Sequence, residues 1–174
     1  MVIYPEQADL RVSQKSLISM LNTTGLLGAA ETDTRFRPGN AFLELICFLG
    51  CSPNVALSPN QDNDPYCTIE VAASQDQIRC QFASNTRAPK CPVCRTNLSQ
   101  LLCDEMLKPC YLQNCPECQT ELDLTTLNWR KSAVFAQSWI EINNIFEAEA
   151  VPHDDLMQYL KKETGAVWKV AYLR

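Results

Sequence analysis

The chain lacks most of the side chains and motifs from which catalytic centres are usually built. His153 is the one histidine among its 174 residues, so any Ser–His or Cys–His nucleophilic mechanism would depend on it. It stands beside two aspartates at a predicted helix start, where a surface histidine is the simpler interpretation. The phosphate-loop, dinucleotide-binding, nucleophile-elbow and H-E-x-x-H motifs are missing as well. The sequence therefore contains no set of residues that compels catalysis.

Long apolar runs and a secretory leader pattern are also missing. No run approaches the ~18–20 apolar residues of a membrane span. The first residues, MVIYPE, show no basic stretch followed by an apolar one. Hydrophobic residues make up 46% and charged residues 20%, which is ordinary for a soluble globular protein. We therefore expect one domain over residues 1–174, in a reduced and cytoplasmic protein with no membrane partner.

Cysteine, by contrast, is plentiful, and four of the ten cysteines belong to a repeated motif. The pattern C-P-x-C-x-T-x-L occurs at residues 91–98 and again at 115–122. Two thiolate pairs at this spacing suit one tetrahedral Zn²⁺ ion, with no coordination position left open. The predicted ligands of one structural Zn²⁺ per chain are Cys91, Cys94, Cys115 and Cys118.

This segment resembles the four-cysteine zinc-ribbon, or zinc-knuckle, modules found in many unrelated proteins. The resemblance covers residues 91–122 only, and no family is recognised for the whole chain. Many such knuckles carry glycine just after the second cysteine, where Arg95 and Gln119 stand here. We therefore expect these two residues to adopt a left-handed or bridge conformation. Of the residues that follow each turn, we expect the leucines, Leu98 and Leu122, to cover the metal and the threonines to lie on short strands.

Other interpretations of the cysteines stay open. A C-x-x-C pair is also a redox motif, although a thioredoxin-like centre needs one such pair at a helix start. An iron–sulfur cluster could use the same four ligands. We expect three other cysteines to be core residues, namely Cys47, Cys67 and Cys80. No role is assigned to the remaining three, which are Cys51, Cys103 and Cys110.

The hydrophobic pattern predicts an α+β fold, with a mainly antiparallel sheet, two or three helices and an inserted zinc ribbon at residues 87–127. Helices are expected at 13–25 and 152–165, with a short one at 98–107. Residues 28–40 are expected to form a loop. Strands are expected at 42–49, where the run is buried, and at 55–57, 67–71, 78–82, 133–146 and 167–173.

Two of these strands are expected to form a hairpin with each other. Alternation in residues 67–71 and 78–82 places every apolar residue on one side if the turn is at Ser74–Gln75. Glu70 would then lie opposite Arg79, as a cross-strand ion pair. The turn lacks the glycine or asparagine that a tight hairpin prefers.

Charge bears on the class of partner. The chain has a formal net charge of −5, which disfavours non-specific nucleic-acid binding. We therefore expect a non-catalytic, cytoplasmic zinc protein that serves as an accessory or adaptor subunit through protein–protein contacts. A thiol or metal-dependent enzyme is one alternative. The other is a nucleic-acid-binding ribbon that would use the basic residues Arg87, Lys90, Arg95, Lys108, Arg130 and Lys131.

Overall fold

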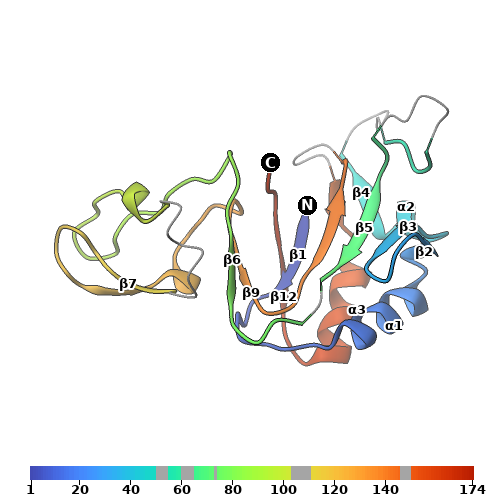
Figure 1. The fold of residues 1–174 in the computed structure, drawn as a ribbon, viewed down its shortest axis with the longest axis horizontal. Coiled ribbons are helices and arrows are strands. Elements are labelled where there is room, and N and C mark those ends of the chain that lie inside the picture. The colour runs from blue at the N-terminus through green and yellow to red at the C-terminus, as the bar shows by residue number, and fades with distance from the viewer. Residues whose placement is uncertain (50–54, 60–64, 73, 103–110, 146–149) are drawn as a thin grey trace.

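The computed structural model describes residues 1–49, 55–59, 65–72, 74–102, 111–145 and 150–174 (Figure 1). Within them it has three α-helices and a set of short strands whose pairings are all antiparallel, which confirms the α+β class. The helices are α1 (Gln14–Thr24), α2 (Phe42–Leu45) and α3 (Asp154–Thr164), and the 3₁₀ turns are η1 (Ser99–Leu102) and η3 (Leu124–Thr126). The strands are β1 (Val2–Pro5), β2 (Leu27–Ala30), β3 (Arg35–Pro38), β4 (Ile46–Phe48), β5 (Thr68–Val71), β6 (Arg79–Gln81), β7 (Leu112–Asn114), β8 (Glu121–Asp123), β9 (Val134–Ala136), β10 (Ile140–Asn143), β11 (Ala150–Pro152) and β12 (Trp168–Ala171).

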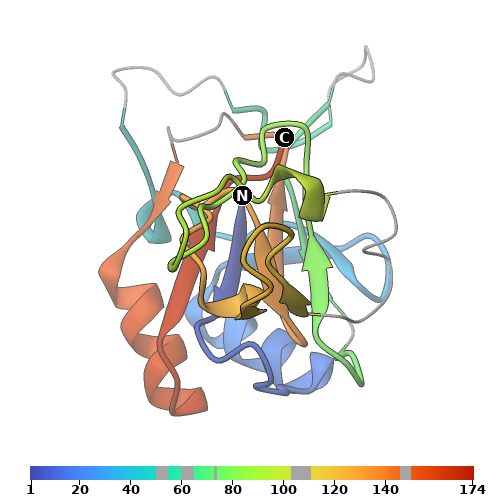
Figure 2. The same cartoon turned by 90° about the vertical axis from the view of Figure 1, so that its left-hand side faces the viewer.

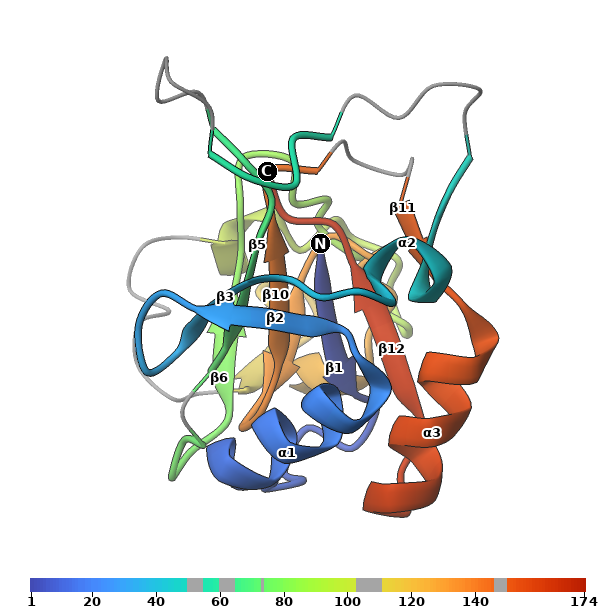
Figure 3. The same cartoon turned by 90° about the vertical axis from the view of Figure 1, so that its right-hand side faces the viewer.

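The body of the protein is a six-stranded sheet in the order β12-β1-β10-β5-β3-β2. Helices α1 and α3 cover one face of it (Figure 3). Alternate residues of the central strands point to that face, so Ile3, Ile69, Ile140 and Ile142 are fully buried in the main hydrophobic core. No helix among the described residues is long and apolar enough to cross a membrane.

Helix α1 begins and ends where the sequence predicts, whereas α3 begins after Pro152, which belongs to β11, and ends before Gly165 as predicted. Ser13 caps α1 with its Oγ, which accepts a hydrogen bond from the Ser16 amide at 3.1 Å, and Gly25 ends the helix at a φ of 74°. His153 caps α3, because its Nδ1 accepts a hydrogen bond from the Asp155 amide at 3.2 Å. The only histidine is therefore an exposed capping residue, as predicted.

The predicted hairpin between residues 67–71 and 78–82 is wrong. Strand β5 lies between β10 and β3 in the main sheet, with Ile69 opposite Ile142 and Phe36. Strand β6 pairs with β9 instead. Burial of Cys67, Ile69 and Val71 on one side is confirmed. Alternation fixes which face of a strand is buried, but it does not select the neighbouring strand.

The predicted loop at 28–40 is also wrong, because it contains β2, β3 and the hairpin turn between them. Both arginines of β3 have internal partners, since Arg35 pairs with Glu70 and Arg37 with Glu31, each at 2.9 Å. Phe36 between them is buried. The segment is thus an outer hairpin of the sheet, held by ion pairs on one face and an aromatic ring on the other.

The apolar run at 42–49 and the segment at 55–57 also differ from expectation. The run divides into α2 and β4, and Leu43 in α2 is 55% exposed, so it is not one buried strand. Residues 55–57 form no strand, although the Ala56 carbonyl accepts a hydrogen bond from the Cys67 amide at 2.7 Å. Of the helix predicted at 98–107, residues 99–102 form the 3₁₀ turn η1, and residues 103–107 lie outside the described part.

The strand interpretation of residues 133–146 is confirmed, but as two strands, β9 and β10, with the end of the segment outside the described residues. The final strand is confirmed as β12. The closing β–α–β segment is divided between sheets, because β11 pairs with β4 in a separate two-stranded sheet while β12 lies at the edge of the main one. The C-terminal helix thus bridges two sheets.

A long insertion separates β6 from β9, although these strands are antiparallel neighbours. Residues 82–133, called here the insert, project from the body and contain both cysteine motifs (Figure 1). The sequence-based bounds of 87–127 lie inside it. At its neck, formed by residues 86–87 and 129–132, Ser132 Oγ accepts a hydrogen bond from the Arg87 amide at 2.8 Å and donates one to the Trp129 carbonyl at 2.6 Å. The two ends of the insert are therefore held together.

Aromatic packing joins the insert to the body. The rings of Phe82, Trp129 and Phe135 form a triangle with centroid separations of 5.3, 5.8 and 5.4 Å. Such tilted and edge-on contacts are favourable beyond the apolar area that they bury. The cluster belongs to the same hydrophobic core as Cys91 and Cys115, so packing is continuous from the motif to β9.

Candidate metal centre

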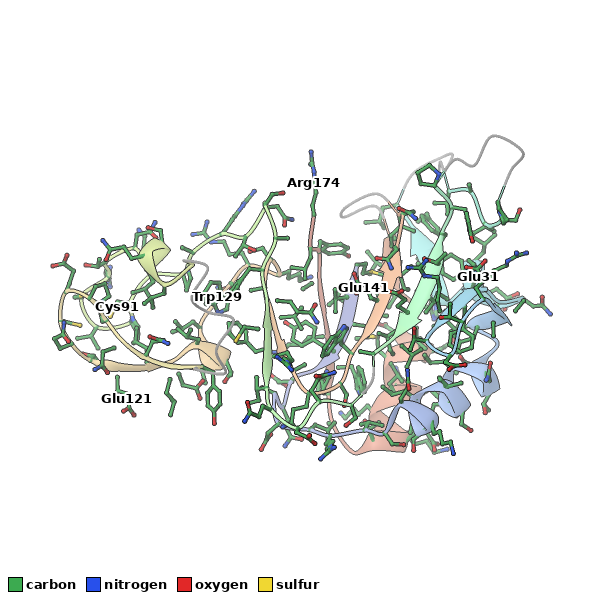
Figure 4. All side chains as sticks on the ribbon, in the orientation of Figure 1. Glu31, Cys91, Glu121, Trp129, Glu141 and Arg174 are labelled. Carbon is green, nitrogen blue, oxygen red and sulfur yellow. The ribbon has the colours of Figure 1, made fainter. Side chains whose placement is uncertain are left out.

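The four cysteines of the repeated motif lie close together in the insert. Their Sγ atoms all lie within 4.8 Å of one another. The Sγ atoms of Cys91 and Cys118 are 3.7 Å apart, and those of Cys94 and Cys115 are 3.6 Å apart. A disulfide would bring two sulfurs to about 2.05 Å, so these are separate thiols. The arrangement could hold a metal ion, and Cys91 marks its place in Figure 4.

The two C-P-x-C turns have the same backbone structure. In the first turn the Arg95 amide donates to the Cys91 carbonyl at 3.0 Å, and in the second the Gln119 amide donates to the Cys115 carbonyl at 2.9 Å. The amide of the first cysteine in each turn then donates to the carbonyl of the following threonine, at 2.9 Å in both. The repeat in sequence is thus a repeat in structure.

The residues that flank each turn pair in equivalent ways. Lys90 bridges Asn97 around the first turn, and Asn114 pairs with Glu121 in the β7–β8 ribbon around the second. Leu98 and Leu122 are buried in the same cluster as two of the cysteines, as expected. Contrary to expectation, the threonines do not lie on the strands but just before these paired residues. Their carbonyls accept the hydrogen bonds that close the two turns.

The residue after each second cysteine has the predicted left-handed backbone. Arg95 has a φ of 64° and Gln119 a φ of 58°. Residues with a β-carbon adopt this conformation at a cost, which is why glycine is usual there. The conformation allows the turn to close on the first cysteine while the second points toward the same centre.

Threonine hydroxyls assist ionisation of the outer cysteines, a role that sequence reasoning missed. Thr120 Oγ1 lies 3.2 Å from Cys118 Sγ. This hydrogen bond, together with one from the Thr120 amide, lowers the pKa of Cys118 to about 6. The equivalent hydrogen bond from Thr96 lowers the pKa of Cys94. The threonine shared by both motif copies was the available signal, because metals bind thiolates and not thiols.

Burial differs between the two cysteines of each turn. Cys91 and Cys115 are fully buried in the hydrophobic core of the insert, whereas Cys94 is exposed and Cys118 half-buried. The centre therefore has an inner side fixed by packing and an outer side near solvent.

Comparison with protein-family models, with curated proteins and with solved structures gives no match for this chain in any of the three.

The remaining cysteines lie apart from this centre or outside the described residues. Cys67 is buried in the main core, as predicted, and burial raises the pKa of its thiol to about 12. Cys47 and Cys80 are only half-buried. The three cysteines without an assigned role all fall outside the described residues. Among the residues that are described, no second group of cysteine, histidine or acidic side chains is placed to share a metal.

The predicted basic residues fall into two groups. Lys90 and Arg95 belong to the first cysteine turn. Arg130 and Lys131 lie at the neck, where the Arg87 amide bonds to Ser132. Lys108 lies outside the described residues.

Proposed function

We propose that the four cysteines hold one structural Zn²⁺ ion, and that the protein is a non-catalytic accessory or adaptor subunit that works through protein–protein contacts in a reducing, cytoplasmic setting. The observation that carries the proposal is the closed tetracysteine cluster, in which all four ligands come from the chain. A catalytic zinc ion keeps one position for water or substrate, whereas a four-cysteine site leaves none.

The sulfur spacing favours a single ion. Four sulfurs placed about 2.3 Å from one central ion would lie about 3.8 Å from each other. The two measured separations of 3.7 and 3.6 Å are close to this value. An iron–sulfur cluster has several irons between its cysteines and needs more room than this. Thiolate ligands in tetrahedral geometry are typical of structural zinc.

Two apolar side chains on the surface of the insert support a role in protein contacts. Val93, inside the first cysteine turn, is 64% exposed, and Leu112, on β7, is 50% exposed. Both belong to the insert, which projects from the body (Figure 1). Apolar side chains at the surface of a projecting segment suit docking to another protein. The net charge of −5 argues against non-specific nucleic-acid binding.

Metal content tests the first half of the proposal. Protein purified without chelator should contain one zinc per chain by elemental analysis. Cys91→Ser and Cys115→Ser should lose the zinc and destabilise the insert, because each removes a buried ligand. Cys47→Ser is the matched control, because Cys47 lies on β4, outside the cluster, and this variant should keep full zinc. A zinc-free wild-type protein, or one containing iron with visible absorbance, would contradict the zinc assignment.

Affinity capture with crosslinking from native lysate tests the second half. Partners captured by the wild-type protein should be lost with Cys115→Ser and weakened by Val93→Glu, which keeps the zinc. Tight, salt-sensitive DNA or RNA binding that Lys90→Ala and Arg95→Ala abolish would favour the nucleic-acid alternative instead. Rapid alkylation of Cys91 or Cys115 in zinc-loaded protein, together with disulfide-reductase turnover, would favour a thiol enzyme.

A further inference from the structure

A groove of about 600 Å³ runs between the neck of the insert and the edge of the six-stranded sheet. Its walls include Tyr4 of β1, residues 168–170 of β12, and Arg130 and Lys131 of the neck. Figure 2 looks at the molecule from the side of the insert, with β12 and α3 behind it. The groove therefore brings together a strand edge and a basic segment that are far apart in sequence.

The wall formed by β12 is an open strand edge. The Glu6 amide donates to the Val167 carbonyl at 2.8 Å, so odd-numbered residues of this strand turn their peptide groups toward β1. Trp168, Val170 and Tyr172 turn theirs outward. The Tyr172 amide donates to the Lys131 carbonyl at 2.8 Å. No other described backbone group bonds to the outward amides and carbonyls of Trp168 and Val170.

The neck already makes one hydrogen bond of the kind that a further strand would make with this open edge. The carbonyl of Lys131 stands where the next strand would pass, beside the end of β12. An extended segment entering the groove could therefore continue the same ladder along Val170 and Trp168. Open edges of this kind accept a strand from another chain, with main-chain hydrogen bonds as the source of affinity.

Charge determines which strand would fit. Three cations line the groove, Arg130, Lys131 and Lys169, against one carboxylate, Glu6, which pairs with Lys169 at 2.7 Å. Among the described residues, neither Arg130 nor Lys131 has an ion-pair partner. The groove is thus positive on a chain whose net charge is −5. Complementary charge across an interface steers association and selects partners.

The aromatic floor of the groove argues against single-stranded nucleic acid as its occupant. Trp129, Phe135 and Trp168 line it, but each is only 4–5% exposed. Stacking of bases requires an accessible ring face. Three cations, one already paired, would also neutralise few phosphates. A peptide that binds through its main chain needs neither feature.

We propose that the edge of β12 receives an extended acidic segment of a partner protein by β-strand addition. This inference rests on the proposed role in protein–protein contacts and names the surface and the chemistry of the partner. Lys169 and Tyr4 face the insert, whereas Trp168 belongs to the core under the helices. In an added strand, residues facing the insert are acidic, and the alternate residues, facing Met157 of α3, are apolar.

Selection of random displayed peptides on the immobilised full-length protein tests this. The enriched peptides should be free of proline, with acidic and apolar residues in alternation. N-methylation of one enriched peptide, position by position, should weaken binding at every second residue, because only alternate amides face β12. Uniform effects of N-methylation would rule out strand addition.

Variants of the neck provide a second test of the proposal. Arg130 and Lys131 have φ values of 53° and 60°, so asparagine, which tolerates a left-handed backbone, removes each charge without adding strain. Arg130→Asn with Lys131→Asn should weaken an enriched peptide about tenfold or more. Lys90→Asn with Arg95→Asn is the matched control, since Arg95 is also left-handed and lies on the cysteine turn, and it should bind normally.

Three further outcomes would overturn the proposal. They are enrichment of no acidic peptide, equal binding by both double variants, and salt-sensitive binding of an oligothymidylate that the neck variant alone loses. Partner capture from lysate that depends on Val93 but not on Arg130 and Lys131 would leave the protein-contact function standing and remove this groove from it. Elemental analysis of the neck variant distinguishes misfolding from loss of the peptide site. A variant that has lost its zinc is misfolded, whereas one that keeps its zinc and binds no peptide has lost the site.

Discussion

At the scale of single residues, the cysteine turns are built on a conformation that their sequence does not favour. Arg95 and Gln119 occupy left-handed positions with φ values of 64° and 58°. Their amides bond back to the first cysteine of each turn, which keeps them there. The strain is small beside the free energy that the proposed structural metal would supply on binding.

Glycine at these two positions should therefore stabilise the protein. Arg95→Gly or Gln119→Gly removes a left-handed penalty of roughly 1 kcal/mol, offset in part by the greater freedom of glycine in the unfolded chain. We expect each to raise the free energy of unfolding by roughly 0.5 kcal/mol, measured by denaturant unfolding with zinc present. Glu117→Gly, in the same turn but without a positive φ, should destabilise instead. Destabilisation by all three variants would contradict this account.

At the scale of elements, the face of the main sheet that points away from α1 and α3 carries a row of charges. Glu70 on β5 lies opposite Glu141 on β10 and opposite Arg35 on β3, with which it pairs at 2.9 Å. Burial first, and then the Glu70 carboxylate, raise the pKa of Glu141 above its usual value of 4.5. The charged form of Glu141 is therefore less stable in the folded sheet than in the unfolded chain.

This raised pKa predicts a pH-dependent effect of Glu141→Gln. Well below pH 4.5 Glu141 is largely protonated in both states, so the variant and the wild type should have similar stability. As the pH rises through the folded pKa, the wild type loses stability that the variant keeps. The variant should be more stable at pH 7 by roughly 0.2–1 kcal/mol, the size usual for cross-strand pairs, in denaturant unfolding. Glu70→Gln, which breaks an ion pair, should show no such gain, and an equal gain at both pH values would refute the assignment.

The elements also show how far the sequence determines the fold. Caps such as Ser13 and Gly25 are local signals, so α1 could be predicted with both of its ends. The partners of β5 could not be predicted, because Ile69 fits any apolar neighbour and its true partner, Ile142, is far along the chain. The cysteine cluster was predictable for the opposite reason. Metal coordination requires particular residues at particular spacings, and few other structures satisfy both.

At the scale of the whole molecule, the described residues form three hydrophobic clusters, of which two are large. One lies between the six-stranded sheet and its helices, and the other runs from the cysteine turns to the aromatic triangle at the neck. Only the second contains the candidate metal ligands. The two regions should therefore depend on metal to different degrees.

Removal of the metal should unfold the insert and leave the sheet. After treatment with a zinc chelator, the amides of Cys91 and Cys115 should lose protection in hydrogen exchange, while those of Ile69, which faces β3, and Ile140, which faces β1, keep it. The tryptophan fluorescence, to which Trp129 contributes, should change over the same range of free metal concentration as the loss of amide protection. Chelator saturated with zinc is the control and should have no effect. Equal loss of protection in both cores would mean that the body cannot fold without the metal.

The position of the insert between two paired strands has a consequence for the rate of folding. Strands β6 and β9 can pair only after residues 82–133 have been closed into a loop, and the entropic barrier of that step grows with the length of free chain. A metal ion that gathers the cysteines first, with Ser132 holding the neck, would shorten the chain left to close. We therefore expect zinc to accelerate pairing of β6 with β9, so that metal supply sets the pace at which this part of the chain folds.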